Sequence, residues 1–305
     1  MDRRTFLAAP FAGALRAQST AEALGYKKSD KLLMVHADDA GMCHSVNLAT
    51  WKALEGGLVT SASIMVPCPW FPEMAAWAKE HPQMDLGVHL TLTSEWKTYR
   101  WRPVSPAAKV PNLVDPDGFL WRDVKSVAQR ATPEEIETEC RAQIERAKQF
   151  GVPFTHLDTH MGTLYGRPEY FDVYAKLALE YKVPCMIPRP ENATLQGYPI
   201  TAGMLQKKLA GGHVGLDYLV TGVEGRGVDD RRASYVKFLR ELKPGVTKLI
   251  VHLALEDAEI QAVTGNWRTR WADFSFFTSD EARKLMSELG IRGMTYRELG
   301  KLVKI

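Results

Sequence analysis

The sequence predicts a single α/β domain, in which strand-like and helix-like segments alternate along a chain of 305 residues. Short apolar runs end abruptly in polar residues, as buried parallel strands do. The segments between them begin at capping residues and end at glycine. No repeat, low-complexity stretch or Pro/Ser-rich linker divides the chain. Alternation over this length favours a barrel over an open sheet, although periodicity alone does not decide between the two.

The composition is that of an ordinary globular protein, with 45% hydrophobic and 25% charged residues. A formal charge of +3 is too small an excess for a nucleic-acid-binding protein. No run of 18 apolar residues occurs, so we expect no membrane span. The four cysteines are far apart and form no Cys-x-x-Cys pair, which excludes a zinc ribbon and a disulfide-built miniprotein. A soluble enzyme domain is the expected class.

The first residues resemble an export signal. Arg3 and Arg4 precede a short apolar stretch at residues 6–15, as in twin-arginine signals. A frayed N-terminal helix is the alternative. We therefore expect a signal segment at residues 1–26 and the folded domain at residues 27–305. With a signal the mature protein would be exported to the periplasm, and without one it would be cytoplasmic.

The first third of the domain predicts three strands and two helices. An apolar run, a Thr/Ser/Val/Ile-rich run and a run preceded by proline indicate the strands, at residues 31–37, 58–66 and 84–92. Ser45 is the expected N-cap of the first helix, which Gly56 and Gly57 end. Residues 70–81 have helical character.

The middle of the chain predicts a long loop and then a well-marked helix. Residues 97–122 contain four prolines and no clear period, which is typical of an irregular loop. Thr132 is the N-cap of the next helix and Pro133 its first residue. Glu135 completes a capping box, and Gly151 ends the helix.

The last half predicts further alternation with one unassigned stretch. Residues 190–235 are Gly-rich and weakly patterned, so no element is assigned there. Thr295 and Glu298 form a second capping box, which begins the C-terminal helix. The other strands are expected at 152–158, 183–187 and 246–255, and the other helices at 168–181 and 279–289.

Residues that bind metals or move protons gather at the ends of four predicted strands. They are Asp38, Asp39, His89, His156, Asp158, His160 and His252. In parallel α/β folds, the loops after the strands carry the active site. One carboxylate and two imidazoles can form a metal triad with open positions, while a second aspartate acts as base and a histidine as acid. Taken singly, the aspartates could form a solvated turn, and His89 and His252 could be core histidines.

Three motifs resemble those of the YdjC/ChbG family of carbohydrate deacetylases. They are Val-His-Ala-Asp-Asp-Ala-Gly-Met at 35–42, Leu-Gly-Val-His-Leu-Thr-Leu-Thr at 86–93 and Thr-His-Leu-Asp-Thr-His at 155–160. A further match at 57–66 lies between the first two, and the resemblance covers residues 30–300. It implies an irregular (β/α) barrel of the polysaccharide-deacetylase type. It also implies a divalent metal, usually Mg²⁺, with Zn²⁺ as the alternative.

The resemblance also implies residue roles. Asp39, His89 and His160 would be the metal ligands, Asp38 the general base and His252 the acid. Two departures occur: Leu-Ala-Leu-Glu follows His252 where the family has Pro-Gly, and Met-Gly-Thr follows His160 where many members carry further histidines. The first departure points to different substrate handling.

Aromatic and basic residues beyond the His89 and His252 strands are candidates for substrate binding. Indole rings stack on sugars but also fill cores, so substrate contact and a subunit interface both stay open. The arginines could hold an acidic or phosphorylated sugar group, or face solvent. The candidates, in segments expected to be polar loops, are Trp96, Trp101, Arg268, Arg270 and Trp271, with Trp267 beside them.

Together these observations predict a metal-dependent hydrolase that removes an acetyl group from an N-acetylated mono- or oligosaccharide such as a chitooligosaccharide. The expected partner is a small carbohydrate rather than nucleic acid, and a homodimer is expected only from the resemblance. Two alternatives stay open. One is a metal-dependent amide hydrolase acting on a non-sugar substrate, and the other is a non-catalytic carbohydrate-binding homologue.

Overall fold

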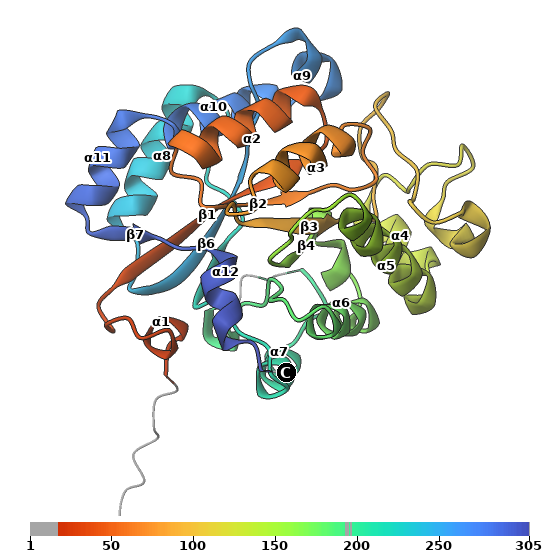
Figure 1. The fold of residues 1–305 in the computed structure, drawn as a ribbon, viewed down its shortest axis with the longest axis horizontal. Helices are drawn as coiled ribbons and strands as arrows, with labels where there is room; N and C mark the ends of the chain where they lie inside the picture. The colour runs from red at the N-terminus through yellow and green to blue at the C-terminus, as the bar shows by residue number, and fades with distance from the viewer. Residues whose placement is uncertain (1–17, 193–194, 196, 305) are drawn as a thin grey trace, which may run out of the picture.

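A sheet of parallel strands forms the centre of the computed structural model, which describes residues 18–192, 195 and 197–304 (Figure 1). Within these residues, six of the seven strands follow the order β4-β3-β2-β1-β6-β5, and β7 pairs with the start of β1. The strands are β1 (Lys31–Ala40), β2 (Ser61–Ile64), β3 (Leu86–Leu90), β4 (Leu157–Thr159), β5 (Tyr218–Val220), β6 (Gly245–His252) and β7 (Ile291–Gly293).

The sheet curls so that one short segment connects its two edge strands. Cys185 forms an isolated parallel bridge with Leu157 of β4, and Pro188 forms one with Leu216, just ahead of β5. The strand expected at residues 183–187 lies here, but it pairs only through these bridges. The expected irregular β/α barrel is therefore confirmed, and residues 183–189 stand where a regular barrel would have a full strand.

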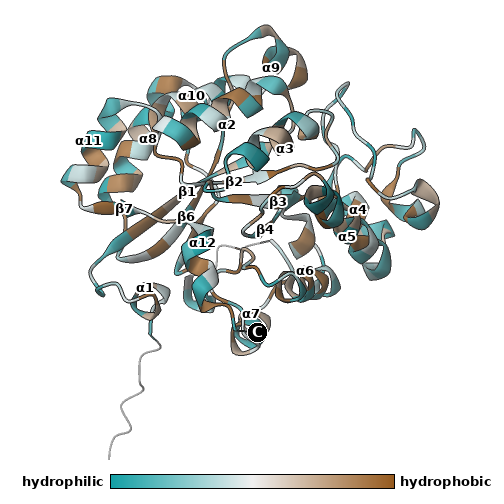
Figure 2. Ribbon diagram, viewed as in Figure 1, coloured by the Kyte–Doolittle hydropathy of each residue, from teal (hydrophilic) through white to brown (hydrophobic). Residues whose placement is uncertain are grey.

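Helices surround the sheet on the outside (Figure 1). Brown, apolar residues concentrate on the strands and on the helix faces turned toward them (Figure 2). The helices are α1 (Thr20–Ala23), α2 (His44–Gly56), α3 (Phe71–Glu80), α4 (Val124–Arg130), α5 (Pro133–Gln149), α6 (Pro168–Glu180), α7 (Ala202–Ala210), α8 (Val228–Arg240), α9 (Ala258–Val263), α10 (Trp267–Phe277), α11 (Asp280–Glu288) and α12 (Tyr296–Leu299). Short 3₁₀ turns are η1 (Ala107–Lys109), η2 (Pro111–Leu113), η3 (His160–Tyr165), η4 (Pro190–Asn192) and η5 (Gly300–Leu302).

The sequence predicts the start of a helix correctly where the capping residue and its partner lie in the same helix. The Thr132 hydroxyl of α5 accepts the Glu135 N–H, and the Glu135 carboxylate accepts the Thr132 N–H at 2.8 Å, so the expected capping box is confirmed. The box formed by Thr295 and Glu298 at α12 is confirmed as well.

The expected cap of α2 is wrong, because its partners come from a distant segment. Cys43 is the N-cap and makes no side-chain capping bond. The Ser45 hydroxyl instead donates to Asp257 at 2.6 Å, and the Ser45 N–H donates to Glu259 at 2.7 Å. These acids lie more than 200 residues away, so a local pattern cannot reveal them.

The long loop at residues 97–122 is confirmed, and two acids of α5 anchor it. Glu139, fully buried, accepts the N–H groups of Val104 and Ser105, each at 2.9 Å. Glu135 accepts the Asn112 N–H at 2.9 Å. These bonds satisfy backbone donors that an irregular segment would otherwise leave unpaired.

Several elements in the last half of the chain were not predicted. The stretch at 190–235 contains α7, β5 and most of α8, and the expected loop around Trp267 and Trp271 is helix α10. Helix α10 packs against both α8 and β6 and buries Arg270 and Asp273. Because its buried faces include charged side chains, α10 lacks a simple apolar stripe.

The described fold starts before residue 27. Helix α1 docks near the start of β6: the Thr20 N–H donates to Asp217 at 3.1 Å, and its hydroxyl donates to the Gly215 carbonyl at 2.6 Å. The expected signal lies mainly in residues 1–17, outside the described residues, so export stays a prediction.

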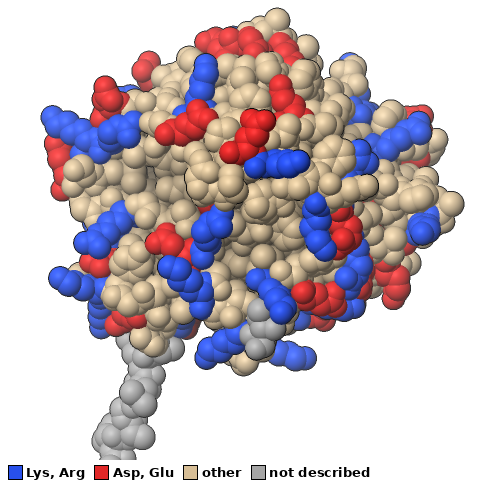
Figure 3. Space-filling model, in the orientation of Figure 1, with Lys and Arg blue, Asp and Glu red and all other residues tan. Residues whose placement is uncertain are grey.

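Within the described part of the chain, no helix is long and apolar enough to cross a membrane. On the face in Figure 3, acidic and basic side chains are interspersed.

Gly87 of β3 provides a test of packing beneath the candidate site. A Cβ at this position would overlap the imidazole of His156, which is completely buried. We expect Gly87→Ala to lower the free energy of unfolding by about 1–3 kcal/mol through overpacking. The matched control is Gly56→Ala at the end of α2, where a Cβ meets nothing within 4 Å. Urea unfolding of both variants measures the difference, and equal stabilities would contradict this packing.

Candidate active site

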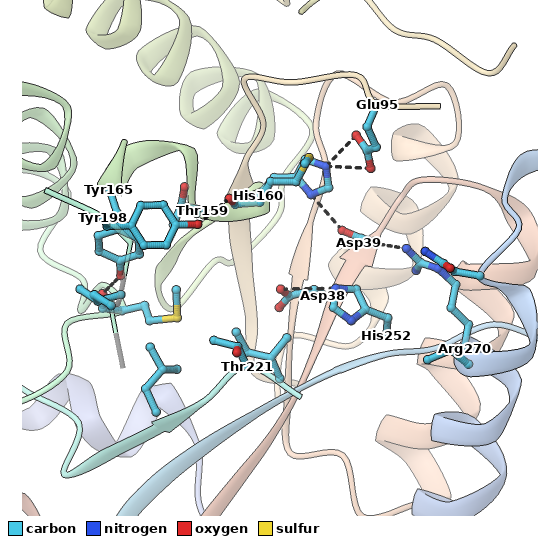
Figure 4. Close-up of a pocket in the computed structure, with 18 of the residues that line it drawn as sticks. Asp38, Asp39, Glu95, Thr159, His160, Tyr165, Tyr198, Thr221, His252 and Arg270 are labelled. Carbon is cyan, nitrogen blue, oxygen red and sulfur yellow. Dashed lines mark hydrogen bonds and ion pairs between the residues drawn. The ribbon is translucent and has the colours of Figure 1, made fainter. Parts of the chain in front are cut away.

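Acidic, basic and imidazole side chains meet at the carboxyl ends of the strands, around a cavity of about 770 Å³ (Figure 4). Asp38 and Asp39 come from β1, His252 from β6 and Arg270 from α10. His160 begins η3 directly after β4. Strand pairing places these residues together, because Asp38 lies opposite His252. The cavity lining also includes Glu95, Trp96, Met161, Tyr165, Tyr198, Thr221 and Arg226.

The three predicted metal ligands converge, with Asp39 and His160 lining this cavity and His89 beside them. His160 Nδ1 lies 3.1 Å and His89 Nε2 3.5 Å from Asp39 Oδ1, and the two ring nitrogens are 3.3 Å apart. All three residues are at least 96% buried. The structure therefore brings Asp39, His89 and His160 to one point, as the sequence predicted.

Asp39 is held in an uncommon conformation. Its φ is +69°, a region that non-glycine residues rarely occupy and that often marks functional sites. The Arg270 guanidinium donates to Asp39 Oδ2 at 2.5 Å. Burial favours the neutral acid, but Arg270 and His160 hold the pKa of Asp39 well below its usual range. Asp39 is therefore an ionised carboxylate with one oxygen already bound.

The triad fits a divalent cation. One ligand atom from each residue lies within 4.8 Å of the others. Asp39 Oδ1 has no hydrogen-bond donor of good geometry among the described residues, although both imidazoles face it. A carboxylate and two imidazoles form a facial ligand set that leaves coordination positions open. The second ring nitrogens are directed away, to partners that orient the rings.

Those partners differ between the two histidines. The Ser63 hydroxyl lies 2.9 Å from His89 Nδ1. The Glu95 carboxylate lies 3.1 and 3.2 Å from His160 Nε2. Burial opposes protonation of His160, yet Glu95 and Asp39 together raise its pKa to about 10. Glu95 was not predicted from the sequence.

Asp38 lies next to the triad but is oriented differently. Its Oδ2 is 3.8 Å from His89 Nε2 and 4.0 Å from His252 Nε2. Burial raises the pKa of Asp38 to about 7, although the nearby His89 opposes the shift. A carboxyl group with such a pKa can take up and release a proton near neutral pH.

His252 stands at the cavity wall. Its backbone N–H donates to Asp273 of α10 at 3.1 Å, and its side chain is 39% exposed. Desolvation lowers the pKa of His252 to about 4, against the attraction of Asp39, which favours the neutral imidazole.

A second buried cluster lies behind the triad. Asp158 Oδ2 lies 2.9 Å from His36 Nε2 and 2.7 Å from the Lys248 ammonium, and His36 Nε2 also lies 3.3 Å from Asp38 Oδ1. His36, Asp38 and Asp158 are close enough together to hold a metal ion. Lys248, which is fully buried, already supplies a cation there. The cluster thus carries its own positive charge.

His156 belongs to the core rather than to the cavity. It is completely buried, and its ring stacks on Tyr296 with centroids 4.0 Å apart. Burial holds the pKa of His156 well below its usual range. Of the two histidines in the 155–160 motif, only His160 reaches the triad.

The predicted substrate-binding residues fall into two groups. Trp96 and Arg270 line the cavity. Trp101 is 2% exposed and donates its indole N–H to the Thr93 carbonyl at 2.8 Å. Arg268 lies over the Trp267 ring, and Trp271 packs against Phe274, both outside the cavity lining.

Sequence reasoning missed several residues of this site. Glu95 carried a weak signal, because it follows the His89 strand closely and is followed by Trp96. The sequence signal for Lys248 was clear, because a lysine inside an apolar strand requires a buried partner of opposite charge. Tyr198 lies in the unassigned stretch, and its hydroxyl donates to the Met161 carbonyl at 3.1 Å.

Comparisons with known proteins find relatives over most of the chain. A carbohydrate deacetylase of Thermus thermophilus is 33% identical over 264 residues, which cover 85% of this chain and 90% of that protein. A chitooligosaccharide deacetylase of Yersinia enterocolitica is 26% identical, over 88% of this chain and 99% of its own. A crystal structure of an Enterococcus faecalis protein superposes with a TM-score of 0.76 at 25% identity, over 89% of this chain and 99% of its own.

The family model described as YdjC-like protein matches residues 32–288, which include every cavity residue discussed above. This match spans most of the 305-residue chain. The chain therefore belongs to the YdjC-like protein family.

Proposed function

We propose that this protein is a metal-dependent deacetylase that hydrolyses the acetamido group of an N-acetylated mono- or oligosaccharide. One observation carries the proposal: Asp39 and His160 of the triad, the carboxyl of Asp38 and the imidazole of His252 line one cavity, and His89 lies beside them within the triad. The relatives described as carbohydrate and chitooligosaccharide deacetylases support the substrate class.

The chain's own residues supply the proton transfers. Asp38 accepts a proton from the water that attacks the acetyl carbonyl. His252 Nε2, 4.0 Å from Asp38 Oδ2, lies where it can receive that proton and deliver it to the departing amine. Asp273 holds the backbone of His252, and Arg270 holds Asp39, so helix α10 keeps both in place.

Asp39, His89 and His160 would hold the divalent cation. When bound, such an ion polarises the carbonyl and lowers the pKa of water. Family resemblance favours Mg²⁺, whereas two imidazole ligands suit Zn²⁺. The Arg270 contact leaves Asp39 Oδ1 as the oxygen that faces the two imidazoles.

The cavity also carries aromatic residues that suit a sugar ring. Trp96 and Tyr198 line it, and aromatic faces stack on sugars. The Tyr198 hydroxyl is already engaged with the Met161 carbonyl, which leaves its ring as a contact surface. We propose Trp96 and Arg270 as substrate contacts. Trp101, Arg268 and Trp271 would act through packing or at a subunit interface, and a homodimer remains a proposal.

We also propose that residues 1–17 direct export through the twin-arginine route. The Arg3-Arg4 pair and the following apolar stretch support this assignment. Expression of the full chain and of an Arg3→Lys, Arg4→Lys variant would separate periplasmic from cytoplasmic accumulation. If the full chain and the variant were distributed equally between periplasm and cytoplasm, residues 1–17 would not be a twin-arginine signal.

Acetate release tests the activity directly. We expect purified protein to release acetate from N-acetylchitooligosaccharides, to lose at least 90% of this activity in a chelator, and to regain it with Mg²⁺ or Zn²⁺. Release from non-sugar amides alone would indicate a different amide hydrolase. Sugar binding without turnover under any metal would indicate a non-catalytic carbohydrate-binding protein.

A further inference from the structure

We propose that Glu95 is the positioning residue of the metal site, because it fixes which nitrogen of His160 faces Asp39 and His89. This inference rests on the proposed function, since it concerns the same triad. Glu95 lies five residues beyond β3, in a segment with no regular structure, and its carboxylate is directed at His160 Nε2. Figure 4 shows Glu95 and Asp39 on either side of the His160 ring.

Both ring nitrogens of His160 have partners. Nε2 lies 3.1–3.2 Å from both carboxylate oxygens of Glu95, while Nδ1 lies 3.1 Å from Asp39 Oδ1 and 3.3 Å from His89 Nε2. A neutral imidazole has one N–H and one lone pair. Both nitrogens face carboxylates, which only accept hydrogen bonds. A cation held by the triad would take the place of a proton on Nδ1. The Glu95 carboxylate would then keep the remaining N–H on Nε2 and leave the Nδ1 lone pair directed into the triad.

The partner of the other ligand is different. His89 Nδ1 faces the neutral hydroxyl of Ser63, which can donate or accept a hydrogen bond. The Asp158 carboxylate is 3.8 Å from His89 Nδ1, beyond hydrogen-bond distance. Of the two ligands, His160 is therefore the one with a carboxylate hydrogen-bonded to its outer nitrogen, which strengthens it as a ligand. The Glu95 side chain is 16% exposed, so the contact is largely shielded from water. Removing the Glu95 carboxylate should therefore weaken metal binding more than removing the Ser63 hydroxyl.

A second glutamate–histidine pair provides a matched control. Glu73 of α3 lies 2.7 Å from His44 Nδ1 of α2, and neither residue belongs to the triad or the cavity lining. Glu73→Ala removes the same type of contact elsewhere in the fold. Any loss of metal affinity specific to Glu95→Ala then reflects its contact with His160 rather than a general loss of stability.

Titration of the full chain with Zn²⁺ tests the inference without substrate. We expect Glu95→Ala to weaken Zn²⁺ binding about 10- to 100-fold, and Glu95→Gln to weaken it less, because an amide oxygen still accepts the Nε2–H. Ser63→Ala should have a smaller effect, and Glu73→Ala none. Excess Zn²⁺ should restore most of the turnover of Glu95→Ala.

A spectroscopic measurement examines the same contact. In the Zn²⁺-loaded protein, the His160 Nε2–H should give a slowly exchanging imidazole proton resonance in NMR spectra. Glu95→Ala should lose this resonance, and Glu95→Gln should keep it. Unchanged Zn²⁺ affinity and an unchanged resonance in Glu95→Ala would overturn the role of Glu95 while leaving the deacetylase proposal in place. Absence of Zn²⁺ binding by the unmodified protein would overturn both.

Discussion

Asp39→Asn is expected to reduce kcat/KM for deacetylation about 10³-fold or more and to eliminate stoichiometric metal binding. The substitution replaces the ionised ligand at the floor of the cavity with a neutral amide, and a metal's contribution to such a reaction is worth several kcal/mol. Asparagine suits this test because it tolerates the left-handed φ of +69° that Asp39 adopts. Metal content by mass spectrometry and initial rates of acetate release give the two readouts.

Asp85→Asn is the matched control for this experiment. Asp85 is also a buried acid, but it accepts the N–H groups of Tyr296 and Arg297 just before β3, at the other end of the strands. We expect this variant to lose stability and to keep its bound metal. Full metal content in Asp39→Asn would refute the assignment of Asp39 as a ligand.

Lys248→Met is expected to lower the free energy of unfolding by about 3–5 kcal/mol. The substitution would leave the fully buried Asp158 carboxylate without its cation, next to His36 and Asp38. An uncompensated charge in such a site is far more costly than a lost surface ion pair. Urea unfolding measures the change, and acetate release then reports whether the neighbouring Asp38 still functions.

The double variant Lys248→Met, Asp158→Asn isolates the pair. Removing both charges should cost clearly less than the sum of the single substitutions, which is the signature of direct coupling. Arg232→Met, which breaks an exposed pair with Glu281, should change stability little. Additive effects at Lys248 and Asp158 would show that the two charges do not depend on each other.

The sequence was most informative where chemistry and strand pattern coincide. Asp39, His89 and His160 follow apolar runs, and parallel pairing brings the ends of such runs to one edge of the sheet. The register explains this outcome: His89 lies opposite Asp158, two residues before His160. Local order along the chain thus gathered the candidate residues, and the family resemblance selected Asp39, His89 and His160 from them.

What the sequence could not predict depends on contacts between distant segments. Arg270 was a candidate for substrate contact, but its closest partner is Asp39, 231 residues away. Glu95 stands in an irregular segment, where no period indicates the direction of a side chain. Strand β5 has only three residues, and residues 183–189 pair through single bridges, so neither produces a distinct pattern.

Helix α10 makes two parts of the site mechanically dependent on each other. Arg270 donates a hydrogen bond to the carboxylate of Asp39, and Asp273, one turn later, accepts one from the backbone N–H of His252. A substitution that shifts or rotates this one helix is therefore expected to disturb the hydrogen bonds that hold a proposed metal ligand and the proposed proton donor at the same time.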